Sequence, residues 1–564
     1  MMKLVLHAVL FSVSAQQSKD DVLVESNVMV AMRDGVKLAV DVYRPGREGR
    51  FPVAMLRTPY GTDRESIPGT YRSLVAAGYV VLCWDCRGKF HSEGEWYPLR
   101  HEAKDGFDCI EWAATQPWSN SNVGMFGGSY LGWVQMLTAG EGNPHLKALV
   151  PQVTPPDPFH NIPYQAGAFL AMSMNWARLV AGREVDAMEQ HSGRWLDFYA
   201  HRPLLEMDDQ TGSTIPFFDD WVRHSKFDDY WKSMSYEHRY GEMDVPALHM
   251  TGWFDDDQTG CIRNFVGLRK GARTERARRG QRLLIGPWGH ALNSGTAIGE
   301  LSFGPDSRID MNATLRRWYD HWLKDEDNGV ENDKPVQIFV IGPNQWRDED
   351  DWPLPRTRFT PFYLHAGGVL STEVPGESAP SDYTYDPEQP TPYLTAEGSA
   401  QVGGPDDYAD LHAEREDLLL FDSRPLTDAV EVTGPLVVHL HAATSCTDTD
   451  WMAMLCDVRP DGKVIRLNDG VQRAMFRESL TDPKPVEAGV VYAYRIDCWA
   501  TSYVFMPGHR LRVAIASAAF PKFYPNGNTG SLDPSVKEVQ VADQEVHHSS
   551  QYPSHILLPV IPAR

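Results

Sequence analysis

No other segment limits how this chain can fold as strongly as residues 122–133, NVGMFGGSYLGW. An apolar run, residues 123–126, leads into Gly127, Gly128 and Ser129, and a helix-compatible segment follows. A serine at a sharp strand-to-helix turn needs very small neighbours, because the backbone is strained and the helix packs closely behind the strand. The pattern predicts an exposed nucleophilic serine, although the spacing is GxSxxG rather than GxSxG and an incidental serine in a glycine-rich turn stays an alternative.

Strand and helix patterns alternate around this turn. Residues 26–45 form two alternating apolar runs joined at Asp34-Gly35, which predicts a hairpin. The apolar runs at 51–61 and 78–88 end in Gly- or Pro-rich loops, and residues 102–115 have helical periodicity. Such alternation predicts a mostly parallel sheet, in which ligands bind beyond the carboxyl ends of the strands.

The pattern changes twice further along the chain. Helical segments rich in Trp, Phe and acids fill residues 151–244, and strand patterns resume at 245. Beyond a Pro-rich stretch, residues 356–564 show short strands and Gly/Pro/Asp turns. We therefore expect an α/β core made of residues 22–150 and 245–355, an inserted helical cap at 151–244, and a β-sandwich or jelly roll at 356–564.

Residues 1–21 form an N-terminal extension or a signal peptide. The start MMKLVLHAVLFSVSA has one Lys, a short apolar run and a Val-Ser-Ala stop, as secretory signals do. The segment is short, however, and contains His7. A cytoplasmic location is slightly favoured, and cleavage of this segment would make the protein secreted or periplasmic.

The charge balance restricts the partners. The chain has 53 Lys and Arg against 76 Asp and Glu, a net charge of −23, so nucleic acid and anionic membranes are not expected as partners. A small neutral or cationic molecule is the expected substrate, and a homodimer stays open.

His439 and His441 share one face of a strand, but no third ligand is near in sequence. We expect no metal and no cofactor.

An acid and a histidine follow later strands in the order that such a serine requires. Asp255 comes after the apolar run 247–251, and His290 comes after the run 282–285. Ser129 would attack, His290 would move the proton, and Asp255 would orient the imidazole. The neighbours Asp256 and Asp257 are the alternative acids.

The same chemistry needs two donors for the oxyanion. One is the backbone N–H of Tyr130, the residue after the serine. The second normally comes from a loop after an early strand, and here that loop offers the Tyr60 hydroxyl. The alternative is that Tyr60 only packs at a Pro turn.

The sequence resembles the bacterial cocaine-esterase-like serine hydrolases, which are grouped with X-Pro dipeptidyl peptidases and α-amino-acid ester hydrolases. The resemblance is carried by NVMVAMRDGVKLAVDVYRP, LRTPY, DCRGKFHSEGEW, NVGMFGGSYLG, GWFD, GPWGH, DEDDWPLP, VFMPGHRLRV and YPSHILLPV. It implies an α/β-hydrolase core, an inserted helical cap and a C-terminal jelly roll. It also implies a triad of Ser129, Asp255 and His290, with Tyr60 and the Tyr130 amide as the oxyanion hole.

Substrate-binding residues are less constrained. Asp256 and Asp257 stand where the cocaine-cleaving members have a Gly-aromatic pair, while the α-amino-acid ester hydrolases carry acids nearby that bind the substrate ammonium. Gln258 replaces an acid expected from that resemblance, and a solvated helix start is the alternative for both aspartates. Other pocket candidates are cap aromatics that also suit the cap core: Phe159, Phe169, Trp176, Trp195 and Phe198.

We therefore expect a serine esterase that works through an acyl-enzyme. The alternatives are an α-amino-acid ester hydrolase or acyltransferase, and an amidase of the X-Pro dipeptidyl-peptidase type. A non-catalytic binding module is a further alternative, against which the complete set of Ser129, Asp255 and His290 argues.

Overall fold

A computed structural model describes residues 22–61, 66–186, 194–394 and 404–562. The expected N-terminal extension, residues 1–21, lies outside the described residues. Among the described helices, none is both long enough and apolar enough to cross a membrane.

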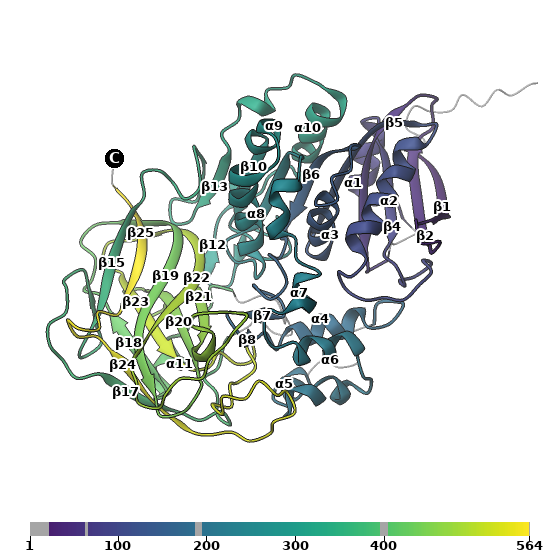
Figure 1. Ribbon diagram of the computed structural model, residues 1–564. Coiled ribbons are helices and arrows are strands. Elements are labelled where there is room, and N and C mark those ends of the chain that lie inside the picture. The colour runs from purple at the N-terminus through teal and green to yellow at the C-terminus, as the bar shows by residue number, and fades with distance from the viewer. Residues whose placement is uncertain (1–21, 62–65, 187–193, 395–403, 563–564) are drawn as a thin grey trace, which may run out of the picture.

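A ten-stranded sheet forms the centre of the first half of the chain (Figure 1). Its strands, in spatial order, are β1 (Val22–Ala31), β2 (Lys37–Pro45), β4 (Val80–Asp85), β3 (Phe51–Thr58), β5 (Ser119–Gly128), β6 (Leu146–Gln152), β9 (Ala247–Gly252), β10 (Gln281–Gly286), β13 (Val336–Val340) and β14 (Gln345–Glu349). The pairs from β4 to β13 are parallel, and the outer pairs are antiparallel. The predicted hairpin is confirmed by the pairing of β1 with β2.

Helices cover both faces of this sheet, so its central strands are apolar without alternation. All eight residues of β3 are buried. Val53 and Met55 pack in one cluster with α2 (Glu102–Thr115) and α3 (Tyr130–Ala139). Ala54 and Leu56 pack on the other face with α1 (Gly69–Ala76) and α10 (Met311–Lys324). The mostly parallel sheet confirms the expected fold class.

The segment between β6 and β9 leaves the sheet and builds a small helical layer beside it (Figure 1). Its elements are β7 (Tyr164–Gln165), β8 (Ala168–Phe169), α4 (Ser173–Val180), α5 (Trp195–Tyr199), α6 (Pro216–Arg223) and α7 (Asp229–Lys232). Its aromatic residues share one hydrophobic cluster with β3, α2 and α3, so the cap packs directly on the core. The division of the chain at residues 150, 244 and 355 stays our proposal.

The C-terminal part is a β-domain of eleven paired strands. They are β15 (Arg358–His365), β16 (Val369–Ser371), β17 (Ser381–Tyr385), β18 (Leu418–Asp422), β19 (Val430–Thr444), β20 (Asp450–Val458), β21 (Val464–Arg473), β22 (Tyr492–Phe505), β23 (Arg510–Ala516), β24 (Ala542–His547) and β25 (His555–Ile561). Its core is continuous with the part of the ten-stranded sheet around β9 and β13, because Trp253, Phe254 and Phe339 belong to the same cluster as Trp451 and Phe505. The loop after β9 is thus packed between two domains.

Candidate active site

Ser129 occupies the turn between β5 and α3 in a strained backbone conformation. Its φ of 60° and ψ of −126° lie where residues other than glycine are rarely found. Its N–H donates to the Gln152 carbonyl at 2.9 Å, which ties the turn to β6. A Cβ on Gly132 would lie 1.9 Å from the Thr154 hydroxyl oxygen, so only glycine lets α3 pack this close. That close contact explains why a glycine stands at position 132, three residues after the serine, and not two residues after it as in the GxSxG motif.

Tyr130 is the first residue of α3, so its N–H has no acceptor within the helix. Its buried phenol donates to Glu102 Oε1 at 3.0 Å and accepts from the Leu99 N–H at 2.8 Å. Arg57 pairs with the other Glu102 oxygen at 2.7 Å. The two contacts to Glu102 involve a charge and are buried, where such contacts are strong, and they fix the side chain of the residue that follows the serine.

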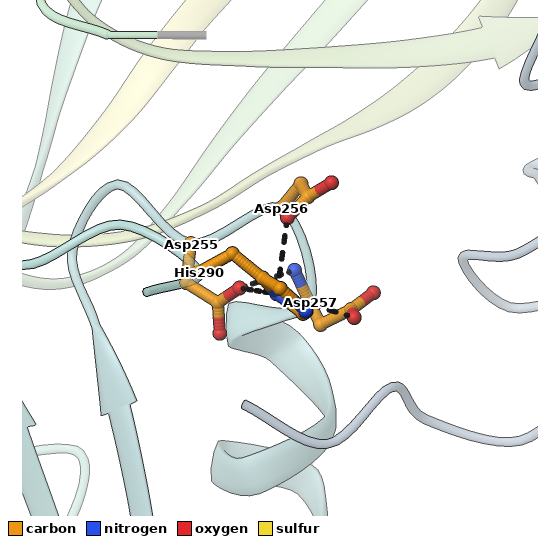
Figure 2. A group of neighbouring side chains, drawn as sticks. All are labelled: Asp255, Asp256, Asp257 and His290. Carbon is orange, nitrogen blue, oxygen red and sulfur yellow. Dashed lines mark hydrogen bonds and ion pairs between the residues drawn. The ribbon is translucent and has the colours of Figure 1, made fainter. Parts of the chain in front are cut away.

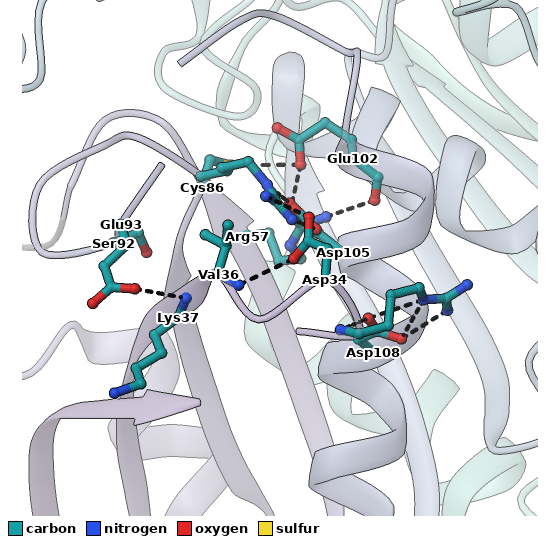
Figure 3. A network of polar contacts seen from close by, with 12 residues as sticks. Asp34, Val36, Lys37, Arg57, Cys86, Ser92, Glu93, Glu102, Asp105 and Asp108 are labelled. Atoms are coloured by element: carbon teal, nitrogen blue, oxygen red, sulfur yellow. Dashed lines mark hydrogen bonds and ion pairs between the residues drawn. The ribbon is translucent and has the colours of Figure 1, made fainter. Parts of the chain in front are cut away.

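The pair of Arg57 and Glu102 belongs to a buried ionic network (Figure 3). Asp105 on α2 accepts from Arg87 at 2.9 and 2.5 Å. Arg87 also pairs at 2.8 Å with Asp34 in the β1–β2 turn, and this hydrogen bond lowers the pKa of Asp34. Removing one partner of a buried ion pair costs about 3–5 kcal/mol. The buried part of the network therefore holds α2 firmly behind the serine turn, and the half-exposed Asp34 ties the N-terminal hairpin to it more weakly.

Asp255 and His290 lie in the loops after the neighbouring strands β9 and β10 (Figure 2). Nδ1 of His290 is 2.9 Å from Asp255 Oδ1. The buried Asp255 carboxylate also accepts from the Thr251 hydroxyl at 2.7 Å and from the Asp257 N–H at 3.1 Å. Because Nδ1 faces a carboxylate, Nε2 is the nitrogen that is left to take a proton from a hydroxyl.

Two further carboxylates surround the same imidazole (Figure 2). His290 Nδ1 lies 3.4 Å from Asp256 Oδ1 and 3.7 Å from Asp257 Oδ2. Burial raises the pKa of Asp256 to about 7 and raises that of Asp257 well above its ordinary value. Burial lowers the pKa of His290, but the hydrogen bond of Asp255 and the charges of all three carboxylates outweigh it and raise that pKa to about 10. The cluster therefore stabilises the imidazolium form.

Asn161 from the cap holds this cluster in place. Its side-chain amide donates to the Asp256 carbonyl at 2.7 Å and to Asp257 Oδ1 at 3.0 Å. Asp257 is 1% exposed, so a solvated helix start does not describe it. Asp256 Oδ1 and Asp257 Oδ2 are buried and accept no hydrogen bond from the described residues. Both oxygens can accept from a donor that the chain does not supply.

Gln258 connects the loop after β9 to the C-terminal domain. Its amide donates to the carbonyls of Trp253 and Ala500 and accepts from the Ala500 N–H, each at 3.0 Å. A carboxylate here would leave both carbonyls without a donor, at the cost of unsatisfied buried acceptors. The glutamine that replaces an expected acid therefore serves the packing of the two domains.

Tyr60 follows β3 and brings its hydroxyl to the serine turn. The hydroxyl oxygen accepts from Trp176 Nε1 at 2.9 Å. Burial raises the pKa of Tyr60 to about 12, against side-chain hydrogen bonds of Trp176 and Ser129 that lower it. The phenol therefore stays neutral at ordinary pH and retains the proton that an oxyanion donor needs.

A cleft of about 780 Å³, including space open to solvent, lies beside these groups. Asp256 and Trp176 line it as expected, together with Asp255. Phe159 and Phe169 do not line this cleft: they are 0% and 1% exposed and pack against Tyr164 in the cap core. Their apolar rings pack in the cap core.

One wall of the cleft comes from the C-terminal domain, and sequence reasoning missed it. Its residues are Tyr393, Arg466, Leu467, Asn468, Asp469, Trp499 and Lys522. They come from β21, from β22 and from two segments outside the strands, spread over residues 393–522, so no single local motif marks them.

Comparison with known proteins identifies the family of this chain. Residues 34–292 match the X-Pro dipeptidyl-peptidase (S15 family), and residues 328–557 match the X-Pro dipeptidyl-peptidase C-terminal non-catalytic domain. The sequence is 36% identical to cocaine esterase from Rhodococcus sp. over an alignment of 581 positions, which covers 95% of this chain and 98% of that protein. The chain belongs to the cocaine-esterase-like family of serine hydrolases. The expected family, the α/β-hydrolase core and the C-terminal β-domain are thereby confirmed.

Solved structures share the whole architecture. An α-amino acid ester hydrolase has a TM-score of 0.85 and 27% identity, with 97% of this chain and 98% of that chain covered. An aminopeptidase from a marine sediment Thaumarchaeota archaeon has a TM-score of 0.86 and 26% identity, with 99% of both chains covered. The chain is thus an enzyme of the carboxylic ester hydrolase class, in a family whose similar members also include peptidases.

The carboxylate cluster predicts how the acidic limb of the pH–activity profile moves when one carboxylate is removed. Above about pH 7, where Asp256 is ionised, Asp256→Asn removes a negative charge from beside His290, so the imidazolium loses stabilisation and its pKa falls from about 10. The acidic limb of kcat/KM should move to lower pH by about one unit, which corresponds to about 1.4 kcal/mol.

The matched control is Asp229→Asn, because the Asp229 side chain is fully exposed in the cap. It should leave the limb in place. An unchanged or higher limb in Asp256→Asn would contradict the electrostatic coupling of Asp256 to His290.

Proposed function

We propose that this protein hydrolyses small carboxylic esters through an acyl-enzyme on Ser129. Ser129 Oγ attacks the ester carbonyl while His290 Nε2 takes its proton. The tetrahedral oxyanion accepts hydrogen bonds from the Tyr60 hydroxyl and the Tyr130 amide. His290 then returns the proton to the leaving alcohol. Water next attacks the acyl-enzyme while His290 takes its proton, and Ser129 Oγ leaves from the carboxylic acid and recovers the proton from His290.

One observation carries this proposal. The buried Asp255 carboxylate holds His290 Nδ1 at 2.9 Å, beside a sheet edge where Ser129 adopts a positive φ at the start of a helix. A positive φ at a serine is costly, and such strain is typical of a residue that is placed for chemistry. The neutral Tyr60 phenol beside Ser129 adds the donor that the negative intermediate requires.

The Ser129→Ala variant tests the nucleophile. Because a triad acts as a unit, kcat for p-nitrophenyl butyrate should fall on the order of 10⁴-fold or more, with an unchanged circular dichroism spectrum. A fluorophosphonate probe should label the wild type at Ser129 and leave the variant unlabelled.

The same assay separates the reaction classes. Wild-type enzyme should hydrolyse p-nitrophenyl butyrate much faster than a Gly-Pro p-nitroanilide. Label on another residue, or faster cleavage of the anilide than of the ester, would overturn the assignment as an esterase acting through Ser129.

A second candidate is hydrolysis of esters whose acyl group carries an α-amine. The buried oxygens Asp256 Oδ1 and Asp257 Oδ2 accept no hydrogen bond from the described residues and adjoin the triad. An ammonium would pair with them through charge-assisted hydrogen bonds, worth about 1.5–3 kcal/mol each. The similar α-amino acid ester hydrolase agrees with this candidate.

A pair of substrates decides between the two candidates. Phenylalanine methyl ester carries the amine, and 3-phenylpropionate methyl ester lacks it. If the cluster binds an ammonium, kcat/KM should favour the amino ester by about tenfold or more, and Asp256→Asn should remove the preference. Equal kcat/KM values in the wild type would reject the amine-binding candidate and leave the simple esterase.

A further inference from the structure

We propose that Trp176, from the cap helix α4, is a positioning residue that aims the Tyr60 hydroxyl at the oxyanion. This inference rests on the proposed function, in which Tyr60 donates to the tetrahedral intermediate. It gives the cap a part in the chemistry, beyond covering the cleft.

The hydrogen bond between the two side chains determines where the Tyr60 proton points. An indole N–H can only donate, so Trp176 Nε1 donates to the Tyr60 oxygen at 2.9 Å. The phenol proton cannot point back at this donor and must point away from the indole. The Ser129 side chain adjoins the same hydroxyl, where it influences the pKa of Tyr60. A hydroxyl that accepts one hydrogen bond is also polarised into a stronger donor. The indole therefore both directs and strengthens the donor.

Aromatic stacking holds the indole in the position that this bond requires. Trp176 stacks on Tyr130, with ring centroids 5.6 Å apart and planes 25° apart. It also stacks on Trp221 of the cap, at 5.9 Å and 8°. Tyr130 is the residue whose backbone amide supplies the other oxyanion donor, and its phenol is fixed by Glu102. Trp176 thus contacts the side chains of both residues that form the proposed oxyanion hole.

The competing explanation is that Trp176 only forms a wall of the cleft, which it also lines. A wall residue would act on KM, and mainly with bulky acyl groups. A positioning residue would act on kcat even for an acetyl group, because the oxyanion forms in every turnover. The two roles also differ in whether the effect depends on the Tyr60 hydroxyl.

A double-mutant cycle on p-nitrophenyl acetate tests the inference. Tyr60→Phe should lower kcat on the order of 100- to 1000-fold, as expected for loss of one oxyanion donor. Trp176→Phe keeps an aromatic ring but loses the N–H, and it should lower kcat about tenfold with little change in KM. In the Tyr60→Phe background the same substitution should change kcat less than about twofold, because the hydroxyl that it orients is already gone.

Two controls separate the lost N–H from altered packing. Benzothienylalanine at position 176 replaces the indole N–H by sulfur and preserves the ring shape, so it should reproduce the loss of kcat. Trp318→Phe makes the same substitution on α10, on the face of the sheet opposite to α2 and α3, and it should keep kcat within about twofold of the wild type.

Each contrary outcome has its own meaning. Equal losses from Trp176→Phe in both backgrounds, or full kcat with benzothienylalanine, would overturn the positioning role while Tyr60 stays in the oxyanion hole. Wild-type kcat in Tyr60→Phe would instead overturn the proposed oxyanion hole itself.

Discussion

The positive φ of Ser129 is the constraint on which the rest of the site depends. A serine gains nothing locally from this conformation, so the surrounding structure must enforce it. The enforcement comes from the Gln152 carbonyl, from the close contact of Gly132 with Thr154, and from the buried pair of Tyr130 and Glu102. These contacts hold the serine where a strand ends and a helix begins, next to the first N–H of that helix, which has no acceptor within the helix.

The other groups of the site are supplied by three parts of the chain that are packed together. The loop after β9 carries Asp255. Asn161 of the cap holds this loop from one side, and Gln258 ties it to Ala500 of the C-terminal domain on the other. Its Trp253 and Phe254 are buried in a core that the two domains share. The C-terminal domain is thus a structural support for the loop of Asp255, the proposed catalytic acid, as well as a wall of the cleft.

The sequence was sufficient to predict the fold class and the position of each proposed triad residue, because these follow from local patterns. Ser129, Asp255 and His290 each stand just after an apolar run, and parallel strands bring their carboxyl ends to one edge. Contacts between distant segments were not predictable. The bond of Trp176 to Tyr60 spans 116 positions, and Lys522 reaches the cleft from the far end of the chain. Phe159 and Phe169 had the same aromatic character as Trp176, and only packing distinguishes them.

A crystal structure of the enzyme inactivated by a phosphonate ester analogue would test the central claim most directly, because the adduct imitates the tetrahedral intermediate. The account predicts phosphorus bonded to Ser129 Oγ, and a phosphoryl oxygen within hydrogen-bond distance of both the Tyr60 hydroxyl and the Tyr130 N–H. His290 Nε2 should face the leaving-group side. An adduct on another residue, or a phosphoryl oxygen that contacts neither Tyr60 nor Tyr130, would contradict the account.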